Sequence, residues 1–111
     1  MIPKIIIKSS DQKMQIKTHK SYRTIVALSD TELLGKTLEE GIKQIEVKPS
    51  FFQGEEKTKE EVIEILKEMQ KEDATFNIVG KESVECALKA GVISKEGIIM
   101  IDNVPVALVL L

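Results

Sequence analysis

The chain has 111 residues, a formal net charge of −2, 42% hydrophobic residues and 31% charged residues. Such a chain forms one globular domain that buries about two thirds of its unfolded surface, which excludes a disordered protein. The single cysteine, Cys86, cannot form an internal disulfide, and no apolar run approaches the ~20 residues of a membrane span. We therefore expect a protein of the cytoplasm with no membrane contact.

The charged residues are distributed unevenly. Of the 16 basic residues only Arg23 is arginine, and lysine, glutamate and isoleucine are abundant. This composition is typical of thermophile proteins, and a low-GC genome would produce it as well. Residues 1–29 carry five lysines and one arginine against one aspartate, whereas residues 55–72 carry seven glutamates against four lysines. The N-terminal part therefore offers the more basic surface.

The first predicted elements are strands. Residues 4–8 indicate a short strand, and residues 14–20 and 22–28 are predicted as an antiparallel hairpin with its turn near His19 to Tyr22.

A first helix is predicted over residues 31–40. Asp30 would cap its first turn and Gly41 would follow its end. Its apolar stripe comprises Leu33, Leu34 and Leu38. Gly35 and Lys36 would then lie in mid-helix, where the amides are already bonded and cannot hold a phosphate.

The middle of the chain continues with a strand over residues 42–48, ended by Pro49, and a loop over residues 50–56. Thr58 opens a second helix, and Glu61 three residues later completes a capping box. The buried stripe of this helix comprises Val62, Ile65, Leu66 and Met69.

The C-terminal part is predicted to contain a strand at 75–80, a third helix at 81–90, and strands at 98–102 and 106–111 joined by a turn at 103–105. The last two strands would form a hairpin.

The predicted order is three strands, then a helix, strand, helix, strand and helix, and finally two strands. Hairpins at both ends with alternating units between them predict an α+β domain with a mixed β-sheet packed with three helices. We expect residues 14–111 to form this single globular domain, and residues 1–13 to be an N-terminal extension or an extra strand.

Gly80 and Lys81 stand between a predicted strand and a predicted helix. A phosphate-binding loop requires a glycine five residues earlier and a hydroxyl residue directly after, but Thr75 and Glu82 occupy these positions. The start of the helix still offers free amides to an anion. A simple turn and an anion site therefore both remain open.

The sequence contains no catalytic constellation. Nucleophilic chemistry of the Cys–His type would have to use Cys86 and His19. We expect Cys86 to be a structural thiol and His19 to lie on the surface. The count of cysteines and histidines excludes a metal site built from these residues. We expect no catalytic residue, metal or cofactor.

The basic N-terminal hairpin is a candidate nucleic-acid contact. Lysines, a histidine and an arginine are interleaved with a tyrosine, which could stack on a base. The residues are Lys17, His19, Lys20, Tyr22 and Arg23. The net acidic charge weighs against this hypothesis, and lysines that protect an edge strand from aggregation are the alternative.

Four ordered motifs resemble those of an archaeal family, domain of unknown function 424. They are D-x-x-L-L-G-K at 30–36, F-F-x-G-E at 51–55, N-x-V-G-x-x-x-V at 77–84 and V-P-V-A at 104–107. Val106 stands where the resemblance leads us to expect a histidine. The resemblance implies an archaeal cytosolic protein and brings no established activity, substrate or cofactor.

The motifs and their neighbours define a candidate ligand or partner site if they gather in space. Its residues are Asp30, Lys36, Phe52, Gly54, Glu55, Asn77, Gly80 and Lys81. Since Phe51 and Phe52 are adjacent, either one enters the core and the other meets a partner, or both face inward.

Together these patterns favour a small non-enzymatic module that binds RNA or a protein partner, with a translation-related role. RNA binding predicts one continuous basic surface, built from Lys17, Lys20, Arg23, Lys36 and Lys81. The alternative is a small-molecule or nucleotide-binding domain, catalytic or not, with a site near the Asn77–Gly80 turn, Asp30 and Lys36. A structural subunit of a homo-oligomer is the third hypothesis.

Overall fold

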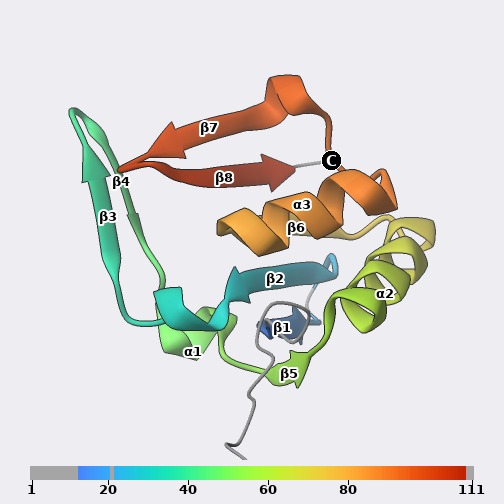
Figure 1. The fold of residues 1–111 in the computed structure, drawn as a ribbon. Coiled ribbons are helices and arrows are strands. Elements are labelled where there is room, and N and C mark those ends of the chain that lie inside the picture. Colours follow the sequence, from blue (N-terminus) through green and yellow to red (C-terminus); the bar gives the residue numbers. More distant parts are fainter. Residues whose placement is uncertain (1–12, 21, 110–111) are drawn as a thin grey trace, which may run out of the picture.

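The computed structural model describes residues 13–20 and 22–109 (Figure 1). Their elements in chain order are β1 (Met14–His19), β2 (Ile25–Asp30), the 3₁₀ turn η1 (Thr31–Leu33), β3 (Thr37–Glu40), β4 (Lys43–Glu46), α1 (Pro49–Phe52), β5 (Glu55–Lys57), α2 (Lys59–Lys71), β6 (Thr75–Val79), α3 (Lys81–Ala90), the 3₁₀ turn η2 (Lys95–Gly97), β7 (Ile98–Ile101) and β8 (Val104–Val109). The predicted strand at 4–8, and the predicted extension at 1–13 except for Lys13, lie outside this part of the chain.

Six strands form the main sheet, in the order β5-β1-β2-β6-β8-β7, and β3 and β4 form a separate two-stranded sheet. Strands β2 and β6 are parallel, and every other neighbouring pair is antiparallel. This is the predicted architecture: an α+β fold whose mixed sheet is packed with three helices.

Both predicted hairpins are present. Strands β1 and β2 pair from Met14 with Asp30 to His19 with Ile25, and β7 and β8 pair from Ile98 with Ala107 onward. Asp102 and Asn103, which connect β7 to β8, have φ angles of 52° and 63°. Two positive φ angles in a two-residue connection match the right-handed twist of the strands and close the hairpin.

Two of the predicted helices are correct in place and in capping. In α2, the Glu61 amide donates to Thr58 Oγ1 over 3.4 Å and the Thr58 amide donates to Glu61 Oε1 over 3.0 Å, which is the capping box. Helix α3 covers residues 81–90 as predicted and ends at Gly91, whose φ is 79°. Local sequence signals were sufficient to place both helices, because α2 contains its own capping box and α3 ends at a glycine, and each has an apolar stripe.

The helix predicted over residues 31–40 is wrong. The chain makes only the turn η1, and residues 37–40 form β3, which pairs with β4. Gly35 has a φ of 84°, which breaks the helix, and its amide donates to the Val47 carbonyl over 2.8 Å. Gly35 and Lys36 therefore lie in the turn that opens a hairpin. The third helix is instead α1, a single turn within the predicted loop.

The sheet separates two hydrophobic clusters. On one face, Val26 and Leu28 of β2 and Phe76 of β6 pack under α2 and α3. On the other face, Ala27 and Val79 pack with the β3–β4 hairpin and α1. Figure 1 shows this hairpin running from the region of α1 to the turn between β7 and β8. The two faces are therefore covered by different kinds of element.

Candidate functional site

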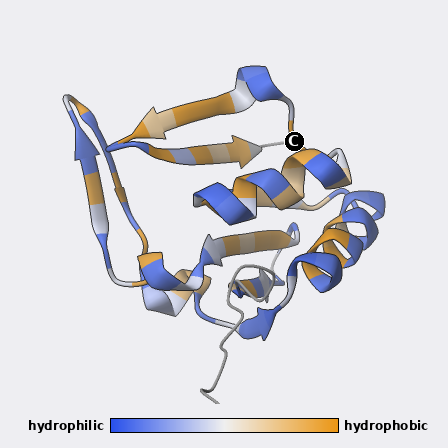
Figure 2. Ribbon diagram, in the orientation of Figure 1, coloured by the Kyte–Doolittle hydropathy of each residue, from blue (hydrophilic) through white to orange (hydrophobic). Residues whose placement is uncertain are grey.

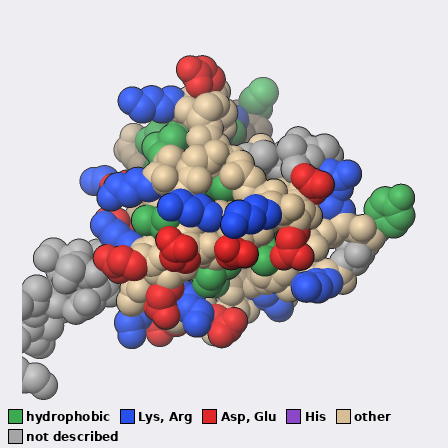
Figure 3. Space-filling view, turned by 90° about the vertical axis from the view of Figure 1, so that its right-hand side faces the viewer, with side chains coloured by type: hydrophobic (Ala, Val, Ile, Leu, Met, Phe, Trp, Pro, Cys, Tyr) green, Lys and Arg blue, Asp and Glu red, His purple; other side chains and the backbone are tan. Residues whose placement is uncertain are grey.

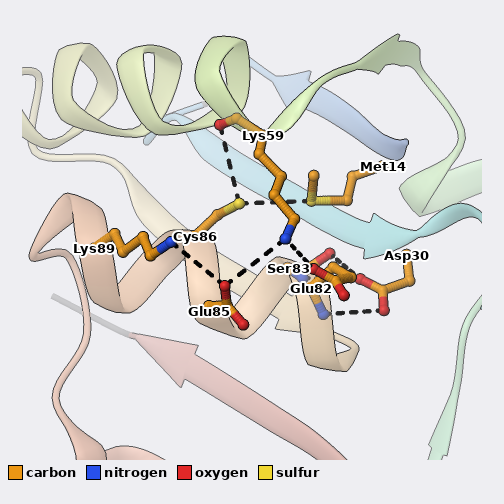
Figure 4. A network of polar contacts seen from close by, with 8 residues as sticks. All are labelled: Met14, Asp30, Lys59, Glu82, Ser83, Glu85, Cys86 and Lys89. Carbon is orange, nitrogen blue, oxygen red and sulfur yellow. Dashed lines mark hydrogen bonds and ion pairs between the residues drawn. The ribbon is translucent and has the colours of Figure 1, made fainter. Parts of the chain in front are cut away.

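The turn at Gly80 does not leave the start of α3 open. The Asp30 carboxylate accepts hydrogen bonds from the Ser83 amide at 2.8 Å, the Ser83 hydroxyl at 2.7 Å and the Glu82 amide at 3.2 Å (Figure 4). Strands β2 and β6 are parallel, so Asp30 at the end of β2 lies directly beside the turn that follows β6. A carboxylate of the chain itself therefore occupies the place where a phosphate would bind.

Gly80 is required by the same arrangement. Its φ is 117°, and a Cβ atom at this position would lie within 2.7 Å of both Asp30 carboxylate oxygens. The prediction that Asp30 caps a helix starting at Thr31 is wrong, since its carboxylate caps α3. Burial raises the pKa of the Asp30 carboxyl above its ordinary value, against the hydrogen bonds from Ser83 and Glu82, which lower it.

Lys59 joins α2 to α3 beside this cap. Its Nζ atom lies 2.8 Å from Glu82 Oε2 and 3.8 Å from Glu85 Oε1, and Lys89 lies 3.4 Å from the same Glu85 oxygen (Figure 4). The hydrogen bond to Glu82 raises the pKa of the Lys59 ammonium. These ion pairs stabilise the contact between the two helices, and they leave Lys59 engaged.

Cys86 is a structural thiol. It is 1% exposed, and its Sγ atom lies 3.8 Å from the Met14 Sδ atom. Burial raises the pKa of the Cys86 thiol to about 11, which makes a thiolate nucleophile unfavourable at neutral pH. Residues 13–20 and 22–109 contain no group of three or more acidic, histidine or cysteine side chains that could hold a metal ion.

Two of the predicted nucleic-acid residues attach α1 to β1. Lys17 Nζ donates to the Ser50 carbonyl over 3.0 Å, and His19 Nε2 lies 2.8 Å from the Phe51 carbonyl oxygen. The His19 and Phe51 rings are stacked, with centroids 4.5 Å apart. His19 is therefore half-buried and has a structural role.

The predicted continuous basic surface does not form. Lys20 and Arg23 precede β2, whereas Lys36 and Lys81 follow the ends of β2 and β6, and a strand of this length spans about 20 Å. In Figure 3, which views the molecule from the side of α2 in Figure 1, blue Lys and Arg side chains alternate with red Asp and Glu side chains. Tyr22, at the β1–β2 turn, is fully exposed at 105%.

The eight residues of the predicted ligand or partner site do not gather at one place. Asp30 and Gly80 are in contact, and Lys81 follows them on the surface. Phe52 is 3% exposed and belongs to the hydrophobic cluster under the β3–β4 hairpin and α1, so it cannot meet a partner in this structure. Asn77 lies in the middle of β6, half-buried and level with Ala27 and Leu108.

Gly54 and Glu55, also predicted for this site, lie at the β5 edge of the sheet. A Cβ atom on Gly54 would collide with the Ile16 carbonyl oxygen of β1, so glycine is needed where the chain crosses this strand closely. The role of Gly54 is therefore explained by packing.

A groove between the tip of the β3–β4 hairpin and strands β7 and β8 was not predicted from the sequence. Its volume is about 310 Å³. It is lined by Ile42, Lys43, Gln44, Ile45, Ile99, Ile101, Val106 and Leu108. Ile42 at the hairpin tip is 104% exposed, and Leu108 is 52% exposed. The available signal was Ile42 directly after Gly41, but Ile42 was assigned to the first position of a strand.

No helix in the described part of the chain has the length and hydrophobicity that a membrane crossing requires. The fold and the groove define a small α+β domain with an apolar surface on the face of the sheet away from its two long helices.

The chain belongs to the family described as "Protein of unknown function (DUF424)", whose model matches residues 18–111. Among solved structures it is similar to an uncharacterized conserved protein from Methanopyrus kandleri, with a TM-score of 0.77 and 19% sequence identity. The similarity covers 86% of this chain and 89% of that protein, and it confirms the fold. No curated protein matches the chain.

Proposed function

We propose that this protein is a small non-catalytic binding module of the archaeal cytoplasm, and that it recognises a protein partner through the groove between the β3–β4 hairpin and β7–β8. The observation that carries this proposal is the groove itself, which combines a volume of about 310 Å³ with exposed isoleucine and leucine side chains. Exposed apolar surface of this kind on a small, highly charged domain is typical of protein interfaces.

The side chains that could act in catalysis contact other groups of the same chain, which supports a binding function over catalysis. The Asp30 carboxylate caps α3, the Cys86 thiol is buried with a raised pKa, and His19 holds α1. A general acid, base or nucleophile must reach a substrate. Each of these three groups contacts its own chain instead.

A binding experiment tests this proposal. The wild-type protein, the Ile42→Lys variant and the Tyr22→Lys variant are immobilised and exposed to an extract of source cells. A protein captured by the wild type is identified and purified, and its affinity for the three chains is measured. We expect Ile42→Lys to weaken binding at least about tenfold and Tyr22→Lys to leave it unchanged. A partner that binds all three chains equally would contradict the use of the groove.

RNA binding at the β1–β2 turn is a second candidate function. The specific observation in its favour is the fully exposed ring of Tyr22, which Lys20 and Arg23 flank in the sequence. An exposed ring between cations is suited to stacking on an unpaired base. A translation-related role would follow if the bound RNA were ribosomal or transfer RNA.

The absorbance ratio at 260 and 280 nm, with and without RNase, tests this candidate on protein purified from source cells. One tyrosine and no tryptophan leave little protein absorbance at 280 nm, so bound RNA would dominate the spectrum. RNA binding predicts a ratio that falls on RNase treatment and in the Tyr22→Ala variant. An RNase-insensitive spectrum would exclude stable RNA binding.

A further inference from the structure

The exposed large hydrophobic side chains are concentrated at one end of the molecule. Within residues 13–20 and 22–109 they are Tyr22, Ile42, Ile99, Met100 and Leu108. Three of the five, Ile42, Ile99 and Leu108, line the groove. Met100 also belongs to β7, but side chains alternate along a strand, so it lies on the opposite face from Ile99 and Ile101. Tyr22 lies at the β1–β2 turn. The groove surface therefore carries three of these five exposed side chains.

We propose that the occupant of this groove is a second copy of the chain, bound through a two-fold symmetric interface. This inference rests on the proposed function, because it takes the groove as the interaction surface and names the protein that fills it. A two-fold interface joins one surface to an identical surface, so the surface must complement itself.

The surface complements itself in shape. Ile42 stands on the rim of the groove at the tip of the hairpin, yet it is 104% exposed and does not fill the groove of its own chain. Ile99 and Leu108 belong to the same groove and are about half exposed. A projecting side chain and a hollow on one surface allow Ile42 of each copy to pack on Ile99 and Leu108 of the other.

Charges of both signs border the groove at the hairpin tip. Lys43 lines the groove and is paired with Glu40 at 3.5 Å. Asp102, which follows β7, lies beside Glu40. Charges of both signs suit an identical surface turned by a two-fold axis, whereas a nucleic acid would require a surface of positive charge.

The contacts at the hairpin tip indicate how the second copy docks. Lys43 Nζ donates to the Met100 carbonyl over 2.8 Å, and the Asp102 amide donates to Glu40 Oε1 over 2.9 Å. Backbone groups at the outer edge of β7 and just after it are therefore already hydrogen-bonded to the hairpin tip. We therefore expect side chains in the groove to form the interface, rather than a continuous sheet through paired β7 strands.

Sedimentation equilibrium of the purified full chain, from micromolar to millimolar concentration, tests the inference. We expect a reversible monomer–dimer equilibrium for the wild type. Ile42→Lys and Leu108→Lys should each raise the dimer dissociation constant at least about tenfold. Tyr22→Lys is the matched control, since it makes the same change in charge at an equally exposed position, and it should leave the dissociation constant unchanged.

Two results would overturn the inference: a wild type that stays monomeric at every concentration, or a dimer that neither groove variant weakens. If the wild type is monomeric and the cell extract still yields a partner that Ile42→Lys releases, the second copy is excluded and the proposed binding function stands. If neither a dimer nor a partner depends on Ile42, both proposals fail.

Discussion

The two faces of the six-stranded sheet are covered in different ways. On one face, α2 and α3 close a core in which Val62, Leu66 and Ala87 are completely buried. On the other face, the elements of the described chain that pack on the sheet are the turn η1, the β3–β4 hairpin and the single turn α1, and the groove lies beside them. The first face is closed by helices, and the second leaves apolar side chains exposed.

The two edge strands of the sheet also differ, one being charged and the other apolar. The edge strand β5 has three residues, all charged, which discourages pairing with another chain. The opposite edge strand, β7, reads Ile-Ile-Met-Ile. Figure 2 shows β5 in the hydrophilic colour and most of β7 in the hydrophobic colour. The apolar edge strand also lines the open groove, so the exposed apolar surface of this region is continuous.

The largest expected effect comes from removing a large side chain from each face of the sheet, which tests whether the two faces are packed with different rigidity. Leu66→Ala should lower the free energy of unfolding by about 4 kcal/mol, because the cavity lies between a rigid sheet and two helices. Leu38→Ala on the hairpin should cost about 2 kcal/mol, because the hairpin can shift toward the sheet. Urea unfolding followed by circular dichroism measures both. Equal losses would show that the two faces are packed with equal rigidity.

A smaller effect is expected at the cap of α3. Gly80→Ala should cost about 3 kcal/mol, because it combines an unfavourable positive φ with displacement of the buried Asp30 carboxylate. Gly91→Ala is the matched control. Its φ is also positive, at 79°, but no atom lies within 4 Å of the added Cβ, so about 1 kcal/mol is expected. Similar losses for both variants would mean that the Asp30 contact adds nothing beyond backbone strain.

The ionisation of Asp30 gives a still smaller effect that depends on pH. Its pKa in the folded protein is raised above its ordinary value of 3.8, so the folded state binds its proton more tightly than the unfolded state. This contribution favours folding at low pH and is lost as the pH rises through the folded pKa. The free energy of unfolding of the wild type, relative to that of Asp30→Asn, should therefore increase as the pH is lowered from 7 to 4. A decrease over this range would mean that the hydrogen bonds outweigh burial.

The smallest effect is expected at the groove. Ile42→Lys should change the free energy of unfolding of the monomer by less than about 0.5 kcal/mol, since the side chain is already fully exposed. Thermal unfolding at low protein concentration measures this. A large loss would mean that Ile42 supports the fold, and the binding experiments would then need Leu108→Lys alone.

The sequence was sufficient wherever an element carried its own signals. Thr58 and Glu61 mark the start of α2, and alternating residues mark the β1–β2 hairpin. The prediction failed over residues 31–40 because Leu33, Leu34 and Leu38 have helical spacing. Local spacing cannot show that residues 37–40 pair with residues 43–46, and the positive φ of Gly35 is not visible in the sequence.

The candidate site was less predictable than the fold. Asp30 was expected to cap a helix over residues 31–40, but its carboxylate caps α3, whose first turn lies more than 50 residues away. The groove depends on the position of the β3–β4 hairpin against β7 and β8, which are joined to it only through tertiary contacts. Such contacts between distant segments leave no periodic pattern in a single sequence.

The cap that Asp30 provides for α3 also has a consequence for the order of folding. The hydrogen bond from the Ser83 amide to Asp30 closes a loop of 53 residues, and it can form only when β2 and β6 have come together as parallel neighbours. The cap on the first turn of α3 therefore forms only after β2 and β6 have paired at the centre of the sheet. Closing a long loop before its contacts are gained slows folding. We expect α2, whose capping box is entirely local, to be helical in the ensemble that precedes the rate-limiting step, and α3 to be completed after it.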